Sequence, residues 1–289
     1  MHKSIYTLLT ATVLFGAGSV MAADKMANHA ATDTANLEKY FAKKFSGVET
    51  SGLINGAYAL SDSKFIQWEA EEEFPRYDQY VAKGEEIYNT PFKNGKSFAS
   101  CFGDDVSAVR VKYPHWDKAN GAVVTLEGDI NKCRTDNGEK PFGWKKGAIA
   151  HVSAYLGYEA RGQKVNVVVP SDDPKAVAAY EDGKHQFYAK RGQLNLACSD
   201  CHVNYAGNYV RGNLLSPSYG HTTHFPVFRN KWSKKTGDGL GTLHRRYGGC
   251  NKQVRAKPFK AQGKEYRNLE FFHAAMSNGL EINAPGFRE

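Results

Sequence analysis

The sequence predicts a mainly α-helical fold of two tandem modules that share one ancestry. Apolar residues recur at helical spacing in several segments. A series of short motifs in the first half returns in the same order in the second half, as in an internal repeat. Residues 198–202 read Cys-Ser-Asp-Cys-His, and Cys-x-x-Cys-His is the attachment motif of haem c. We therefore expect two cytochrome c-like modules, the first without haem and the second carrying one covalent haem c.

The N-terminus is organised like a secretory signal peptide. A short charged start with Lys3 precedes an apolar run at residues 5–20, and the small residues Ala22 and Ala23 follow. The run of 16 residues is short for a membrane span, which makes an uncleaved anchor the weaker alternative. We expect cleavage after Ala22 or Ala23. The mature chain should have no stable membrane span and should lie in the periplasm, where disulfides persist.

Three helical segments are predicted in the first half. Residues 36–45 form a short amphipathic segment. Residues 69–88 have apolar side chains at helical spacing, but they contain Pro75, which lacks a backbone N–H and clashes with the preceding turn. We expect a break or a helix start there. Residues 148–157 are the last predicted helix of this half.

A turn-rich linker leads into the second half. Residues 165–169 are β-branched and predicted to be extended, and the segment 170–174 begins and ends with proline. Its second proline suits the first turn of a helix, which we predict over residues 176–188. The last helix is predicted over residues 266–279, with Gly279 as its C-cap.

The repeat is clearest in two segments that run from a leucine to a cysteine. Leu126–Cys133 and Leu243–Cys250 have the same spacing, and each is followed at the same distance by Lys-Pro-Phe. Cys101–Asp105 stands where the second half has Cys198–His202, but it lacks the second cysteine and the histidine. The shared order argues against chance similarity. We expect four parts: a signal peptide at 1–22, an N-terminal extension at 23–64, a haemless module at 65–172 and a haem c module at 173–289.

The Cys-Ser-Asp-Cys-His motif fits covalent haem better than its alternatives. Cys198 and Cys201 would bond the two vinyl groups, and His202 would present its imidazole to the iron. A zinc ribbon would need a second Cys-x-x-Cys pair, which the sequence lacks. A thioredoxin-like dithiol has no use for the adjacent histidine, and no βαβ pattern precedes the motif.

The remaining cysteines are predicted to form one pair and leave one thiol. In an oxidising compartment, Cys101 and Cys133 should form a disulfide within the haemless module. Cys250 occupies the place of Cys133 in the second module, so it should lie over the haem, opposite His202. Other distal iron ligands stay open at this point, namely Met276, His221, His224, His244 and His273.

Positive charge is concentrated in the second half. The formal net charge is +8, and between Arg229 and Arg267 twelve Lys and Arg residues stand against two acidic residues. An exported protein is not expected to bind nucleic acid, so the excess indicates an anionic small molecule, an acidic protein partner or simply a solvated basic face. Cations beside Cys250 would lower the pKa of its thiol and favour the thiolate. They are Arg245, Arg246, Lys252 and Arg255.

The chain resembles the SoxA family, the larger subunits of the thiosulfate-oxidising SoxAX cytochromes. The resemblance runs from about residue 65 to the C-terminus and is most specific in the second module. Many SoxA proteins carry two haems, and this chain resembles the single-haem form because Cys101–Asp105 cannot attach one. The motifs that carry the resemblance are Ala197–His202, Tyr209–Gly212, Phe225–Arg229 with Trp232, Leu243–Arg246, Cys250, Val254–Ala256, Leu269–Glu270 and Ala284–Arg288.

The resemblance implies an L-cysteine S-thiosulfotransferase. SoxA proteins join thiosulfate oxidatively to a cysteine of the carrier protein SoxYZ, and electrons leave through haem c to a soluble cytochrome acceptor. The expected partner is a SoxX-type small cytochrome c in a heterodimer. By resemblance, Cys198 and Cys201 attach the haem and His202 is the proximal ligand.

The same resemblance assigns the reactive sulfur. It makes Cys250 the distal iron ligand and catalytic sulfur, which in the family is often a persulfide, with Arg246 held beside it. Arg211 and Arg255 are candidate substrate-binding residues. Two other functions compete: a thiosulfate dehydrogenase forming tetrathionate, which normally keeps two haem motifs, and a non-catalytic monohaem electron-transfer cytochrome c.

Overall fold

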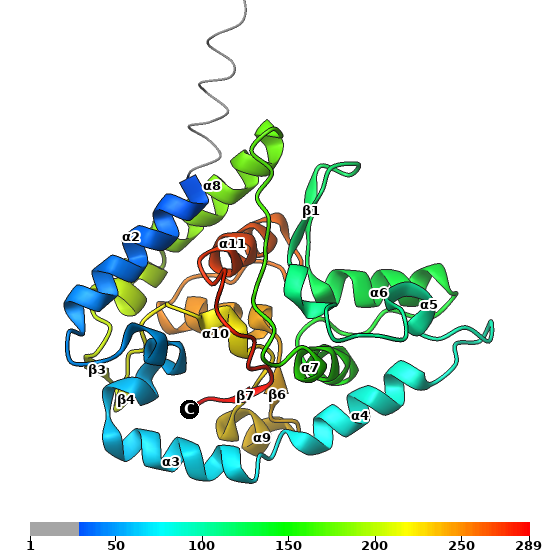
Figure 1. Cartoon of the computed structure of the whole chain (residues 1–289), viewed down its shortest axis with the longest axis horizontal. Helices are drawn as coiled ribbons and strands as arrows, with labels where there is room; N and C mark the ends of the chain where they lie inside the picture. Colours follow the sequence, from blue (N-terminus) through cyan, green and yellow to red (C-terminus); the bar gives the residue numbers. More distant parts are fainter. Residues whose placement is uncertain (1–28) are drawn as a thin grey trace, which may run out of the picture.

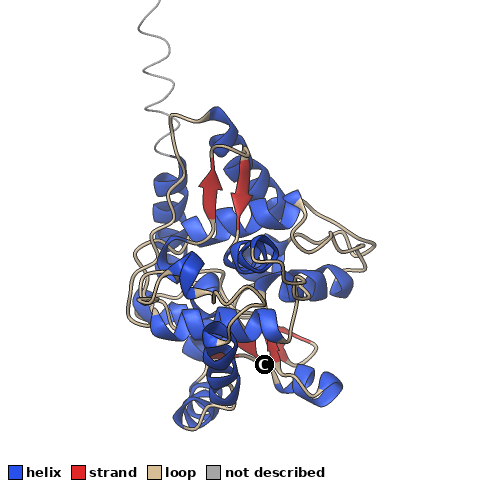
Figure 2. Ribbon diagram, turned by 90° about the vertical axis from the view of Figure 1, so that its right-hand side faces the viewer, coloured by secondary structure: helices blue, strands red, loops and turns tan. Residues whose placement is uncertain are grey.

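A computed structural model describes residues 29–289, so the predicted signal peptide at 1–22 lies outside the described residues. Helices joined by long irregular segments form most of the fold, and the strands are short (Figure 1, Figure 2). Within residues 29–289, no helix has the length and apolar character needed to cross a membrane. The α-helices are α2 (His29–Lys44), α3 (Asp62–Glu73), α4 (Asp78–Asn89), α5 (Ala99–Phe102), α6 (Leu126–Asp136), α7 (Ala148–Glu159), α8 (Pro174–Tyr188), α9 (Asn230–Thr236), α10 (Leu243–Gln253) and α11 (Lys264–Ala275).

Short helical turns and strands complete the secondary structure. β5 lies between β6 and β7, antiparallel to the first and parallel to the second, whereas β1–β2 and β3–β4 are separate antiparallel hairpins. The turns are η1 (Thr50–Leu60), η2 (Arg110–Lys112), η3 (Asp200–Asn204) and η4 (His221–His224). The strands are β1 (His115–Asp117), β2 (Ala122–Val124), β3 (Tyr209–Val210), β4 (Asn213–Leu214), β5 (Val227–Phe228), β6 (Leu240–Gly241) and β7 (Gly286–Phe287).

Each half contains one pair of helices that cross at a glycine. The pair is α4 with α7 in the first half and α8 with α11 in the second. A Cβ atom on Gly84 would lie 2.1 Å from the carbonyl oxygen of His151 in α7. A Cβ atom on Gly183 would lie 2.0 Å from the carbonyl oxygen of Asn268 in α11. Since real Cβ atoms do not approach oxygen so closely, both crossings require glycine.

The repeated sequence segments adopt the same local structure. An antiparallel pair of strands precedes each helix: β1–β2 leads into α6, and β5–β6 leads into α10. A threonine stands just before each helix, and Cys133 and Cys250 occupy the same position, seven residues after the first residue of the helix. The Cys101–Cys133 pair is a disulfide in the structure, with an S–S distance of 2.04 Å, and it joins α5 to α6.

The apolar interior has two clusters. One is built mainly from α4, α6, α7 and their loops, with Phe228, Leu240 and Phe287 added from the second half. The other is built mainly from α8, α10 and α11, and it includes Leu37 and Phe41 of α2. Helix α2 lies along α8 (Figure 1), where Asp33 accepts hydrogen bonds from Lys184 and Tyr180.

Most of the predicted helices are present, with shifted ends. The break at Pro75 is confirmed, because α3 ends at Glu73 and α4 begins at Asp78. Because α3 begins at Asp62, the predicted domain boundary at residue 65 falls inside a helix. Residues 36–45 belong to the longer α2, residues 148–157 belong to α7, and α8 begins at Pro174 with Asp173 as its N-cap.

The predicted C-cap at Gly279 is wrong. Helix α11 ends at Ala275, four residues earlier. The chain then turns because its backbone pairs with the extended segment 165–169: Gly279 N–H donates to Val165 O, and Val165 N–H donates to Leu280 O, each at 2.9 Å. Residues 165–169 form no strand, and the neighbouring Lys164 forms an isolated β-bridge with Glu281.

Candidate haem site

The Cys-Ser-Asp-Cys-His motif is held in a tight turn by its own aspartate. Buried Asp200 accepts hydrogen bonds from the backbone N–H of Ala197, at 2.8 Å, and from the side chain of Asn204, at 3.2 Å. The turn continues as η3, which is π-helical. Short π-helical turns occur often at functional sites, because they redirect a side chain within a helix.

The imidazole of His202 is oriented by a backbone carbonyl. Its Nδ1 lies 2.9 Å from the carbonyl oxygen of Ser216, which can only accept, so Nδ1 carries the proton. This leaves Nε2 unprotonated and able to bind a metal, the arrangement that metal-binding histidines usually have. The hydroxyl of Ser216 lies 2.7 Å from Nε2 of His221, whose ring centroid is 4.7 Å from that of His202.

Three free cysteines lie near one another, and one of them contacts this imidazole. They are Cys198, Cys201 and Cys250, and the charge of Cys250 acts on both of the other thiols. Burial raises the pKa of Cys198 to about 12, with Cys250 and Cys201 adding to the effect. Burial also raises the pKa of Cys201. The structure thus brings the leftover thiol of the sequence to the motif.

Cys250 differs from the two motif cysteines in its charge environment. Burial alone would raise its pKa, but Arg246, a hydrogen bond with His202 and the charge of Arg229 outweigh burial and lower that pKa to about 7. Arg246 lies four residues before Cys250 in α10, on the same face one turn earlier. Cys250 is therefore the thiol of the three that most readily exists as a thiolate.

Arg229 is a site residue that the sequence did not single out. It follows β5 directly, and the pairing of β5 with β6 brings it close to the start of α10. Burial, and next the charge of Arg246, lower its pKa to about 10, whereas Cys250 acts in the opposite direction. Its Nε is buried and has no hydrogen-bond partner within residues 29–289. In the sequence, Arg229 stood out only as the last residue of the Phe225–Arg229 motif, and that motif does not indicate that Arg229 lies near Cys250.

Arg211 and Arg255 are placed differently. Both side chains are exposed, and both residues have positive φ, 54° and 58°. Arg211 lies in the turn between β3 and β4, and Arg255 follows the end of α10. The groups that act most strongly on the Cys250 thiol are Arg246, His202 and Arg229, and a substrate-binding role of Arg211 or Arg255 stays a prediction.

The alternative distal ligands have other contacts. His224 Nε2 lies 2.9 Å from the carbonyl oxygen of Ile54, and His244 lies 3.0 Å from Glu270 and 3.1 Å from the N–H of Gln262. His273 Nδ1 lies 2.8 Å from the hydroxyl of Tyr247. Met276 is buried, 3.8 Å from the hydroxyl of Thr34. None of these four side chains is among the groups that act most strongly on the Cys250 thiol, whereas His202 is.

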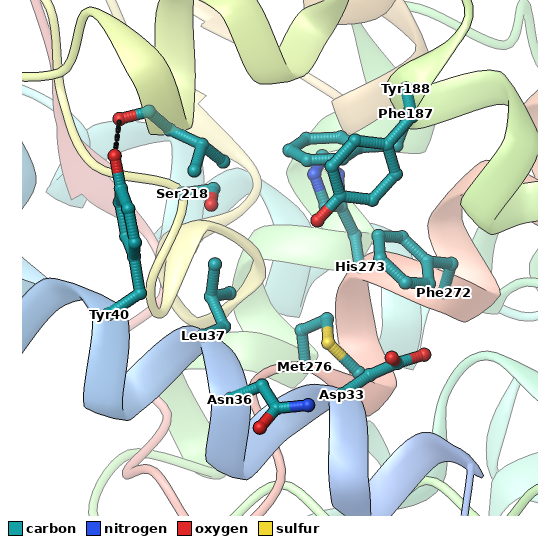
Figure 3. A pocket seen from close by; sticks show the side chains of 11 residues that line it. Asp33, Asn36, Leu37, Tyr40, Phe187, Tyr188, Ser218, Phe272, His273 and Met276 are labelled. Carbon is teal, nitrogen blue, oxygen red and sulfur yellow. Dashed lines mark hydrogen bonds between the residues drawn. The ribbon is translucent and has the colours of Figure 1, made fainter.

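A cavity of about 300 Å³ lies beside the motif, between α2, α8 and α11 (Figure 3). Its walls are largely apolar, and they include Val203, the residue after His202. Two buried polar atoms on its lining, Ser218 Oγ and His273 Nε2, have no hydrogen-bond partner in the part of the chain that the structure describes. The two free thiols of the motif and the imidazole with an available Nε2 are the groups that a covalently attached haem requires.

Comparison with known proteins agrees with this reading of the fold and site. A family model described as the SoxA/TsdA cytochrome c domain matches residues 83–165. The fold and site therefore define a c-type cytochrome, whose cofactor is covalently bound haem c. The matched residues belong to the first half, whereas the intact attachment motif lies outside them at residues 198–202.

The sequence relatives specify the family. The chain is 48% identical over 286 residues to the L-cysteine S-thiosulfotransferase subunit SoxA of Allochromatium vinosum, covering 98% of each chain. It is 50% identical over 282 residues to the subunit of that name from Chlorobaculum thiosulfatiphilum, covering 96% of each. The crystal structure of SoxXA from P. pantotrophus is similar with a TM-score of 0.66 at 29% identity, covering 74% of this chain and 78% of that chain. The chain belongs to the SoxA family, which confirms the resemblance seen in the sequence.

Proposed function

We propose that this protein is a periplasmic L-cysteine S-thiosulfotransferase subunit that oxidatively joins thiosulfate to a cysteine of a SoxYZ-type carrier protein. The observation that supports it most is the position of Cys250. This half-buried thiol lies against the imidazole of the haem-attachment motif, and Arg246 and Arg229 favour its anionic form. The relatives that bear this activity in their names match nearly the whole chain.

We propose that the two halves are tandem cytochrome c-like modules and that the haem belongs to the second. Support comes from the glycine crossings of α4 with α7 and of α8 with α11, and from the equivalent positions of Cys133 and Cys250. The cytochrome c family model matches the half that has no attachment motif. In that half a disulfide joins Cys101 and Cys133, whose counterparts in the second half are Cys198 and Cys250.

The residues proposed to hold the haem follow from the site. Cys198 and Cys201 would form the thioether bonds, and His202 Nε2 and the sulfur of Cys250 would bind the iron. When bound, the haem accepts electrons one at a time, and a sulfur ligand favours its ferric state. One haem cannot hold both electrons of the reaction, so a second haem on a partner is required.

The proposed chemistry is carried by the sulfur of Cys250. Thiosulfate is a dianion, and the guanidinium groups of Arg246 and Arg229 would hold and orient it beside the thiolate. Oxidation joins the sulfane sulfur to Cys250: the thiolate and thiosulfate give Cys250–S–S–SO₃⁻ and two electrons. The thiolate of the carrier then attacks the sulfane sulfur, forms the carrier–S–S–SO₃⁻ product and releases the Cys250 thiolate. The carrier thiol loses one proton in the overall reaction.

The proposed partners follow from the electron count. The similar structure is a SoxXA complex, and we propose that a SoxX-type small cytochrome c forms a heterodimer with this chain and supplies the second haem. Electrons then pass to a soluble cytochrome acceptor. The basic second half would favour an acidic carrier surface.

The product formed from thiosulfate tests the proposal. The purified heterodimer is mixed with thiosulfate, a reduced carrier protein and an oxidised cytochrome. The mass of the carrier should increase by that of one S₂O₃ group, and the two electrons should appear on the cytochrome. Tetrathionate as the product would instead identify a thiosulfate dehydrogenase. Electron transfer without either product would identify a non-catalytic electron-transfer cytochrome c.

A further inference from the structure

The N-terminal segment, residues 29–60, packs against the proximal side of the haem site. It lies before the residues that the cytochrome c family model matches, which begin at 83. Helix α2 forms one wall of the cavity beside the motif, and its Leu37 and Tyr40 line that cavity (Figure 3). The turn η1 then packs against η4, and its Gly56 lies against Ser216 in the loop that contacts His202. The segment therefore contacts the chain on both sides of that histidine.

On one side, α2 holds the backbone that follows His202. The ammonium group of Lys44 donates to the carbonyl oxygen of Val203 at 2.8 Å and to that of Asn204 at 2.6 Å. The hydroxyl of Tyr40 also donates to Val203 O, at 3.4 Å (Figure 3). The last carbonyls of a helical turn lack partners within it, so these donors satisfy the end of η3 and fix its direction.

On the other side, η1 fixes the residue that orients the imidazole. Gly56 has φ of 65°, and a Cβ atom at this position would lie 2.7 Å from the hydroxyl oxygen of Ser216. Ser216 is the residue whose carbonyl accepts the hydrogen bond from His202 Nδ1. Two residues earlier, the carbonyl of Ile54 lies 2.9 Å from Nε2 of His224, which anchors η1 to η4.

We propose that residues 29–60 are a positioning element for the proximal iron ligand: Lys44 and Gly56 together set the orientation of the His202 imidazole and the strength of its Nδ1 hydrogen bond. The inference rests on the proposed assignment of His202 as that ligand. The bond at Nδ1 controls how strongly an imidazole donates electrons to a metal, so a segment remote in sequence tunes the electronic state of the haem.

Two variants with matched controls test this in the haem-loaded heterodimer. Lys44→Met removes the donors to Val203 and Asn204, and Lys43→Met removes an equal charge from the neighbouring, exposed position of α2. Gly56→Ala crowds Ser216, whereas Gly52→Ala adds the same methyl group where no atom lies within 4 Å. Haem attachment to the peptide containing Cys198 and Cys201 is verified by mass spectrometry in each.

The readouts are the EPR spectrum of the ferric haem and its midpoint potential. Lys44→Met should broaden or split the low-spin signal, because the imidazole is less restrained. Gly56→Ala should raise the potential, because a weaker Nδ1 bond makes the imidazole a poorer donor.

A change in either variant relative to its control supports the inference, and no change in both overturns it. If Gly56→Ala does not accumulate, Lys44→Met decides alone. Haem absent from the wild-type peptide would instead overturn the proposed attachment site.

Discussion

The disulfide of the first module should contribute several kcal/mol to stability without touching the haem. The double variant Cys101→Ala/Cys133→Ala removes it. The two cysteines are 32 residues apart in the sequence. The chain-entropy relation gives about 3.7 kcal/mol at 25 °C for a loop of this length. With a slope of about 4 kcal/mol per molar guanidinium chloride, the unfolding midpoint should fall by about 1 M.

The assay is guanidinium chloride denaturation followed by far-ultraviolet circular dichroism. Cys133 is buried, so alanine there also loses packing contacts. The wild-type protein under reducing conditions is the control, since it loses the covalent link and keeps both sulfur atoms. Without reductant, the native haem absorption spectrum should be the same in the wild type and the double variant. A loss below about 1 kcal/mol in both the variant and the reduced protein would refute the entropic reasoning, and an altered haem spectrum would refute the separation of the disulfide from the haem site.

Three further predictions concern the haem site. A pyridine haemochrome assay should give one haem per chain, and two would show that the first half also attaches one. Cys250→Ser should keep covalent haem but lose the thiolate-type ferric spectrum and most turnover; unchanged spectrum and turnover would mean that a histidine or Met276 binds the iron. Arg246→Ala should lower turnover and thiosulfate affinity by about 1.5–3 kcal/mol, roughly tenfold to a hundredfold, with a nearly unchanged ferric spectrum. Lys234→Ala, an exposed cation in α9, is its control and should match wild type in steady-state kinetics.

Local patterns were sufficient for the elements that depend on nearby residues. The proline break between α3 and α4 and the start of α8 at Pro174 follow from backbone constraints within a few residues. The repeat carried further, because it related Cys250 to Cys133 and so pointed to a site that no local pattern showed. The assignment of these residues to haem ligation and catalysis remains a prediction.

Features that depend on distant segments were beyond the sequence. Gly279 has the composition of a C-cap, but α11 ends earlier because the following turn pairs with residues 165–169, more than a hundred positions away in the chain. Arg229 reaches the site through the pairing of β5 with β6. Lys44 contacts the backbone carbonyls that follow His202, about 160 residues later in the sequence. A pattern of apolar residues cannot predict a contact between such distant segments.

The glycine crossings bear on how such a chain diverges. In the proposed tandem arrangement, the first half is released from the demands of a cofactor, so the residues equivalent to the attachment motif, Cys101–Asp105, are free to change. Gly84 is not released in this way, because any side chain there would collide with the carbonyl of His151 whether or not a haem is bound. Among descendants of this lineage, position 84 should therefore stay glycine even after the residues of the attachment motif have changed. The proposed tandem arrangement thus predicts that the helix crossing persists in the first half longer than the residues of the attachment motif.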